Sequence, residues 1–392
     1  MGVFCLAGCS QKSEVPNKEV STVEGAESSG GSGSSSANGS TAGSSTASTS
    51  ASAAGATVGG GSNIAAVLFD SGGADSNAFN QEIWSGMKSF VKSHTEWKAK
   101  ATEFAGDADT AQHSSALQSA VDSGAKMIVC VGSTYSTLLP AAADANPDVS
   151  FLLVDAEMTD TAGAAVSKNN VHCVTFDNAQ AGYLAGYALV KEGYRGLGFA
   201  GGKAVPSVML YGSGFVQGAN AAAEADGVAA DTYLAYWYTD TFAASEAVQT
   251  EVQRWYGNGV DVVFSCGGSI SENVIAAAAA TSKTCAMADA DGSKLSSTVV
   301  CSATKNLSGG ISDALGAFTK NNSSWDQDMA GKTSKLGLAD DGVSLTCGST
   351  WKLTKFSESD YKALVDKIKS GEIVVNEDAN ATLNVAIQVD RK

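Results

Sequence analysis

The sequence has few basic residues for its length. Its 392 residues include 25 Lys and Arg against 41 Asp and Glu, which gives a net charge of −16 at pH 7 and a pI near 4.6. A surface with this charge repels nucleic acids and anionic membrane surfaces. We therefore expect no nucleic acid among its partners.

Histidine and the usual catalytic motifs are also scarce. Only His94, His113 and His172 occur, and they lie outside the strand ends discussed below. H-E-x-x-H is absent, and no Ser-His-Asp order typical of a hydrolase is present. An enzyme, such as a nucleoside hydrolase or a phosphatase acting through Asp70 and Asp75, is therefore a weaker alternative to a protein that only binds its ligand. The sequence predicts no catalytic residue, no cofactor and no metal site.

The cysteines lack the spacing of a redox or metal motif, because no two of them stand as C-x-x-C. Cys5 and Cys9 belong to the N-terminal region. Several of the other six end apolar runs, as in MIVCVG, which favours buried free thiols, with one disulfide left open for an exported protein. These six are Cys130, Cys173, Cys266, Cys285, Cys301 and Cys347.

No apolar run is long enough to cross a bilayer, and the N-terminal region predicts a different kind of attachment. Leu6-Ala7-Gly8-Cys9 resembles a bacterial lipobox, so residues 1–8 are expected to be the remnant of a signal peptide and Cys9 the lipidated residue. Residues 9–62 are rich in Gly and Ser and predict a disordered tether. We expect a protein held by its lipid anchor at the extracellular face of the cell membrane.

From residue 63 onward, short apolar runs alternate with amphipathic segments, which predicts a doubly wound α/β fold. The pattern occurs twice and indicates two lobes with a cleft between them, where ligands commonly bind. The expected helices lie near 80–94, 110–124, 135–144, 207–226, 243–258, 269–280 and 357–370. The last of these should be capped by Ser357 with Asp360, and should bury Tyr361, Leu364, Val365 and Ile368.

Carboxylates and glycines recur where the predicted strands end. They would face the cleft between the two halves, and because they recur in both halves they favour a shared pocket, although each alone is a common turn or cap residue. They are Asp70, Gly132 and Ser133, Asp155, Gly267 and Gly268, and Asp289. Asp291, also near the last strand end, is better explained as a turn cap before Gly292.

The first of these loops, in FDSGGADSNAFNQEIW (69–84), contains no Lys or Arg and neither phosphate-binding glycine spacing. Its two aspartates would repel an anion, so the loop favours a neutral ligand that offers hydroxyl or amide donors. The alternative is that Asp75 or Ser76 only caps the following helix.

Several segments resemble the basic membrane lipoprotein family, solute-binding receptors of ABC transporters that include purine-nucleoside receptors. The matching segments occur in the family's order: GGADSNAFNQEIWSGMK, GFAGGKAVPSVMLYGSGFVQGANAA, YWYTDTF, NGVDVVFSCGGSISENVIAAA, ADAD and VVCSATKN. The resemblance covers about residues 63–322 and, more weakly, the tail.

The resemblance implies two Rossmann-like lobes joined by a hinge, as in type I periplasmic binding proteins. The first lobe would comprise residues 63–175 and 306–335, and the second residues 176–305 and 336–392. It also implies a purine nucleoside as the ligand, with Phe79 stacked on the base and Asp289 accepting hydrogen bonds from the ribose hydroxyls. Gly268, which has no side chain, would let the backbone approach the ligand. The other implied binding residues are Asp70, Asn80, Asp155 and Lys305, with Trp237, Tyr238 and Phe242 as candidates for a second aromatic.

The function implied is nucleoside capture for uptake by the permease subunits of an ABC transporter, by a monomer that is not an enzyme. The alternative on the same fold is a sugar or autoinducer receptor. A pentose would use the carboxylates but would leave the aromatic rings without a partner.

Overall fold

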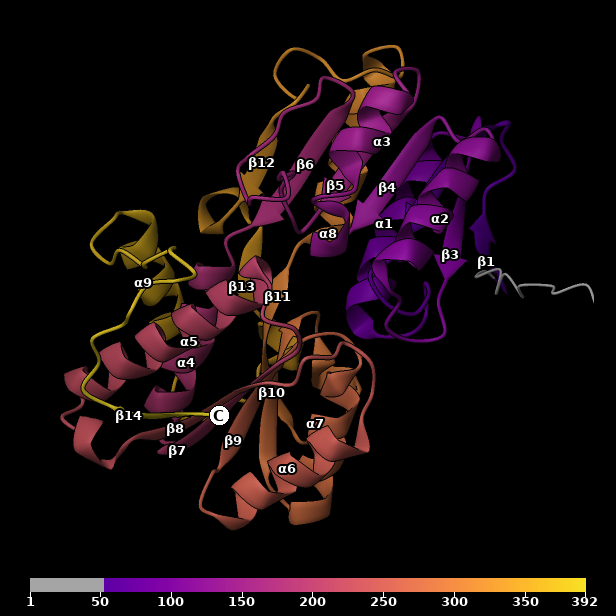
Figure 1. Ribbon diagram of the computed structural model, residues 1–392. Coiled ribbons are helices and arrows are strands. Elements are labelled where there is room, and N and C mark those ends of the chain that lie inside the picture. Colours follow the sequence, from indigo (N-terminus) through magenta and orange to yellow (C-terminus); the bar gives the residue numbers. More distant parts are fainter. Residues whose placement is uncertain (1–52) are drawn as a thin grey trace, which may run out of the picture. The chain divides into compact units, whose positions relative to one another are not determined.

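The computed structural model describes residues 53–392, so the lipobox and most of the predicted tether lie outside the described residues. The described chain forms two seven-stranded sheets (Figure 1). The first sheet has the order β1-β3-β2-β4-β5-β6-β12. Its strands are β1 (Ala53–Val58), β2 (Asn63–Leu68), β3 (Trp97–Glu103), β4 (Met127–Val131), β5 (Ser150–Val154), β6 (Val171–Phe176) and β12 (Thr333–Leu336).

The central strands β2, β4 and β5 are mostly apolar and buried because helices cover both faces of the sheet. Along β2, Ala65 and Val67 join the core beneath α1 and α8, whereas Ala66 and Leu68 join the core beneath α2 and α3. This is the arrangement expected of a parallel sheet, and only β1 is antiparallel to its neighbour. The helices are α1 (Ala78–Ser93), α2 (Thr110–Asp122), α3 (Leu139–Ala145) and α8 (Leu307–Lys320).

The second sheet has the order β13-β11-β10-β9-β7-β8-β14. Figure 1 shows α4 and α5 on one side of it and α6 and α7 on the other. Its strands are β7 (Gly196–Gly201), β8 (Tyr233–Tyr238), β9 (Val262–Cys266), β10 (Thr284–Asp289), β11 (Val299–Lys305), β13 (Val343–Leu345) and β14 (Gln388–Arg391). Its helices are α4 (Asn178–Glu192), α5 (Pro206–Ala225), α6 (Glu246–Gly257), α7 (Ile270–Thr281) and α9 (Glu358–Lys369). The α/β architecture of two lobes is therefore confirmed.

The chain passes three times between the two lobes. It leaves the first sheet after β6 and enters α4, which packs on α5. It returns at the end of β11, where Lys305 is followed by α8, which packs on α1. The third passage lies between β12, which pairs with β6, and β13, which pairs with β11.

Helices α4 and α5 approach each other closely through glycines. A Cβ on Gly182 would lie 2.1 Å from the carbonyl oxygen of Tyr211, and one on Gly218 would lie 2.0 Å from that of Tyr183. Gly186 and Gly214 make equivalent contacts, so each helix presents a G-x-x-x-G row to the other. This packing fixes α5, whose first turn reaches the site described below.

The prediction for the tail helix is confirmed. Ser357 caps α9 and forms a capping box with Asp360, and Tyr361, Leu364 and Ile368 are buried. Val365 is only partly buried and packs at the edge of the core.

The predicted tether extends too far toward the C-terminus. Residues 53–58 form β1, which pairs antiparallel with β3. The reason is that β3 would otherwise be an edge strand, and its free backbone groups accept a partner whose composition alone gives no strand signal.

The prediction of buried free thiols holds for most of the described cysteines. All six described cysteines are free; five are buried and Cys347 is exposed. No helix among residues 53–392 is both long enough and apolar enough to cross a membrane.

Candidate functional site

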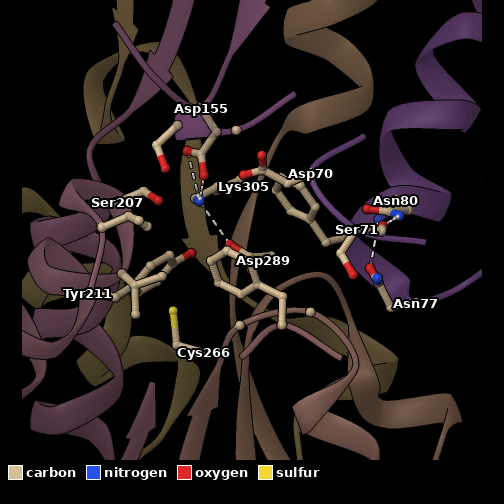
Figure 2. A pocket seen from close by; sticks show the side chains of 18 residues that line it. Asp70, Ser71, Asn77, Asn80, Asp155, Ser207, Tyr211, Cys266, Asp289 and Lys305 are labelled. Carbon is tan, nitrogen blue, oxygen red and sulfur yellow. Dashed lines mark hydrogen bonds and ion pairs between the residues drawn. The ribbon is translucent and has the colours of Figure 1, made fainter. Parts of the chain in front are cut away.

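Strand ends from both sheets converge on one cavity, and Figure 2 shows the side chains that line it. From the first lobe it receives the ends of β2, β4 and β5, and from the second those of β9, β10 and β11. The lining residues are Asp70, Ser71, Asn77, Phe79, Asn80, Gly132, Ser133, Asp155, Val205, Ser207, Val208, Tyr211, Phe242, Cys266, Gly267, Gly268, Asp289 and Lys305.

A buried lysine joins the two lobes at the centre of the cavity. Lys305 Nζ lies 2.9 Å from both carboxylate oxygens of Asp155 and 2.9 Å from Oδ1 of Asp289 (Figure 2). The side chains of Lys305, Asp155 and Asp289 are only 2%, 8% and 12% exposed. Asp155 follows β5 in the first lobe and Asp289 ends β10 in the second, so the lysine bridges carboxylates of both lobes.

The protonation of this cluster follows from burial and charge. Burial lowers the pKa of Lys305, but the carboxylates of Asp155 and Asp289 outweigh it and hold the pKa above its usual range. Burial raises the pKa of Asp155, and the charge of Lys305 offsets this only in part. One cation faces two carboxyl groups, so the cluster has acceptor capacity beyond what the lysine uses.

The two carboxylates of the cluster share an uncommon backbone conformation. Asp155 has φ 62° and Asp289 has φ 73°, in the left-handed region that few residues other than Gly, Asn and Asp adopt. Strain of this kind clusters at functional sites, because the surrounding structure must hold it in place.

Asp70 also lines the cavity, but it does not belong to the cluster around Lys305. Burial raises its pKa to about 6, although hydrogen bonds from Thr134 and the charge of Lys203 act in the opposite direction. Its carboxylate presses against Gly132, where a Cβ would lie 1.9 Å from Asp70 Oδ2. Gly132 also has φ 91°, so only glycine fits here.

The loop between β2 and α1 is held by its own polar side chains. Asn77 caps α1 by accepting from Asn80 N at 2.9 Å. The predicted caps Asp75 and Ser76 do not have this role; Ser76 Oγ instead accepts from Gly73 N. The Asn80 side chain donates to Ser71 O and Gly73 O at 2.9 Å each, so it fixes the loop while it lines the cavity.

Two of the predicted aromatic residues, Phe79 and Phe242, line the cavity. Trp237 instead packs edge-on against Trp255 at 6.3 Å, beneath α6. Tyr238 shares a hydrogen bond of 2.6 Å with Tyr236. Of the three candidates for the second aromatic, the structure therefore brings only Phe242 into the cavity.

The residues that α5 contributes to the cavity were not predicted from the sequence. Ser207, Val208 and Tyr211 line the cavity from the first turns of this helix. Tyr211 is fully buried, and its hydroxyl donates to Ala303 O at 3.1 Å. The signal available was Pro206, a helix-start residue a few positions after β7, since a helix that begins near a strand end points its first turn at the same edge.

The cavity itself holds about 60 Å³, room for only a few water molecules. A cavity of about 460 Å³ adjoins it and shares Ser133, Asp155 and Ser207. Another of about 350 Å³ shares Phe79 and Asp289. Ligand sites usually measure about 300–1,000 Å³, so each of these two neighbouring cavities reaches that size by itself.

Comparison with known proteins identifies the family. Residues 63–379 match the Bmp family, described as "ABC transporter substrate-binding protein PnrA-like". This chain belongs to that family. The match confirms the resemblance drawn from the sequence.

Among curated relatives, the nucleoside-binding protein BmpA of an ABC transporter from Lactococcus lactis is 28% identical over 217 residues. The match covers 55% of this chain and 58% of the Lactococcus protein. Basic membrane protein A1 of Borrelia garinii is 25% identical over 313 residues, which cover 79% of this chain and 87% of that protein.

Among solved structures, an ABC transporter solute-binding protein from Aeropyrum pernix aligns with a TM-score of 0.66 at 19% identity. The alignment covers 81% of this chain and 94% of that chain. A second solute-binding protein, from Conexibacter woesei, aligns with a TM-score of 0.61 at 19% identity. At these identities the likeness concerns the fold.

Proposed function

We propose that this substrate-binding protein captures purine nucleosides in the cavity between its lobes. The observation that carries the proposal is that two aromatic rings, Phe79 and Phe242, and the cluster of Lys305 with Asp155 and Asp289 line the same cavity. The rings suit a flat base and the carboxylates suit the ribose hydroxyls. The relative in Lactococcus lactis bears the name of a nucleoside-binding protein.

The expected energies are sufficient for tight binding. Stacking of a base on an aromatic side chain contributes about 1–3 kcal/mol. A hydrogen bond to a charged group contributes about 1.5–3 kcal/mol. Two rings and two carboxylates therefore favour a sub-micromolar dissociation constant after the cost of association.

The remaining parts of the proposal concern delivery. We propose that the protein acts as a monomer, that Cys9 carries a lipid at the extracellular face of the membrane, and that closure of the lobes on the nucleoside precedes its transfer to the permease subunits. Cys9 lies outside the described residues, and its role rests on the lipobox-like sequence. The three passages between the lobes are where a closing motion would bend the chain.

A ligand panel tests the proposal. Isothermal titration of the purified protein with guanosine, inosine, adenosine, ribose and the free bases should show sub-micromolar binding of a nucleoside and much weaker binding of ribose. Phe242→Ala should weaken nucleoside binding about tenfold through lost stacking. Trp237→Phe, outside the cavity, should leave the affinity unchanged. Ribose binding as tightly as the nucleosides would contradict the proposal in favour of a sugar receptor.

Nucleoside affinity should depend on pH through Asp70. An ionised Asp70 accepts hydrogen bonds from N–H groups of the base, whereas the protonated form loses acceptor capacity. Because its pKa is raised to about 6, affinity should fall as the pH drops below that value. Asp70→Asn should remove this step in titrations over roughly pH 5–7. The stability of the unliganded protein should change in the opposite direction, because an acid with a raised folded pKa loses its stabilising contribution as the pH rises.

A further inference from the structure

A carboxylate outside the cavity connects the two lobes next to Phe242. Asp107 lies in the first lobe, in the loop between β3 and α2. Its carboxylate accepts from Thr241 Oγ1 at 3.0 Å and from Phe242 N at 3.3 Å, and lies 3.2 Å from Lys203 Nζ. All three partners belong to loops of the second lobe. The Asp107 side chain is 25% exposed, so these contacts are only partly hydrated.

The same contacts fix the position of Phe242. Its N–H donates to Asp107, and its carbonyl accepts from Ser269 N at 2.8 Å. Its ring lies against Gly202, where a Cβ would be 2.5 Å from a ring carbon. Lys203 Nζ lies 5.3 Å from the ring centroid. The backbone of Phe242 is thus held from both lobes and its ring from the second lobe.

Asp107 is also tied to the ligand loop of its own lobe. Gly72 N donates to Gly106 O at 3.2 Å, and Phe104 N donates to Gly72 O at 3.0 Å. Ser71, which lines the cavity, forms a β-bridge with Asp107. One short segment therefore contacts both the loop that follows β2 and the loop that carries Phe242.

We propose that Asp107 is a positioning residue that fastens the closed lobes and holds Phe242 against the bound ligand. This inference rests on the proposed function, since the ligand it retains is the nucleoside. Asp107 does not line the cavity, so it acts through Phe242 and through closure. The contacts form only when the lobes are together; their loss should therefore speed ligand release much more than it slows ligand entry.

The test is stopped-flow measurement of guanosine binding to the full chain. Asp107→Ala should raise the dissociation rate about tenfold and change the association rate less than threefold. Asp107→Asn keeps an acceptor for Phe242 N–H but loses the charge facing Lys203, and should give an intermediate rate. Thr241→Val should also raise the dissociation rate in the unmodified protein, but should have a smaller effect in the Asp107→Ala background, where only its hydrogen bonds with the backbone of Ala243 remain to be lost.

The matched control is Asp144→Ala, which removes an ion pair with Lys168 inside the first lobe and should leave both rates unchanged. The unliganded lobes should also close part of the time, so hydrogen exchange at the Phe242 amide without ligand should quicken in Asp107→Ala and provides a readout that needs no nucleoside. If the unmodified protein binds no guanosine, the proposed function fails, and amide exchange still decides the role of Asp107. Unchanged exchange and unchanged dissociation in Asp107→Ala and Thr241→Val would overturn the inference.

Discussion

Lys305→Met should lower the free energy of unfolding by about 3–5 kcal/mol at neutral pH, because it leaves two buried carboxylates without their cation. The lysine side chain is 2% exposed, and it is the ion-pair partner of both Asp155 and Asp289. Methionine fills a similar volume, so lost packing contributes little. Urea denaturation of the two proteins at pH 7 measures the difference.

The effect should shrink as the pH falls. Burial already raises the pKa of Asp155 with the lysine present, and without the lysine protonation becomes the easier way to relieve the buried charge. Lys305 itself has a raised pKa, so its contribution in the unmodified protein is fully present at neutral pH and is lost only as the pH rises through that value.

Lys168→Met is the control for this variant. Lys168 pairs with Asp144, whose side chain is 64% exposed, and the loss should stay within about 1 kcal/mol. Adding Asp155→Asn and Asp289→Asn to Lys305→Met should recover much of the lost stability, because no buried charge remains. If Lys305→Met unfolds at the same urea concentration as the unmodified protein, the cluster does not stabilise the closed lobes.

The centre of the site could be predicted from the sequence because it depends on one simple rule. Parallel strands of one sheet end at the same edge, so Asp70 and Asp155 were expected together in the first lobe, and Asp289 was expected to face them from the second lobe across the predicted cleft. The structure places all three in one cavity. The rule says nothing about which charges pair, and the bridging position of Lys305 between the lobes became visible only in three dimensions.

The aromatic residues show where a one-dimensional pattern is insufficient. In YWYTDTF, four aromatic rings stand close together in the sequence, but successive side chains of a strand point to opposite faces. Trp237 therefore joins the core beneath α6, while Phe242, in the loop beyond the strand, reaches the cavity. Which aromatic ring reaches the cavity depends on where β8 ends, and the sequence defines the ends of strands poorly.

Other elements were missed because their partners supply most of the stabilisation. Helix α4 buries residues all around its circumference and packs through Gly182 and Gly186, so it shows no amphipathic pattern. Strand β14 completes the edge of the second sheet beside β8, although residues 388–391 are mostly exposed. In both cases the structure is specified by a neighbour that is distant in the sequence.

Asp289→Asn should weaken nucleoside binding by about 30-fold or more, or about 2 kcal/mol, because a charged acceptor of two ribose hydroxyls becomes a neutral amide with one acceptor oxygen. Asparagine is the appropriate replacement here. It keeps the size of the side chain and tolerates the left-handed backbone at φ 73°, which alanine would not. Lys305 would retain Asp155 as its partner, so the fold should be little affected.

Titration with guanosine and 2′-deoxyguanosine separates the ribose contact from a general loss of affinity. The unmodified protein should bind the deoxy form less tightly, since a site built to bond a hydroxyl is left with an unpaired polar group when that hydroxyl is missing. Asp289→Asn should discriminate less between the two. Asp291→Asn is the matched control, because Asp291 caps the following turn by accepting from Ser293 N at 2.8 Å, as expected from the sequence. If Asp289→Asn binds guanosine as tightly as the unmodified protein, Asp289 does not hold the ribose, and the case for a nucleoside rests on the aromatic rings alone.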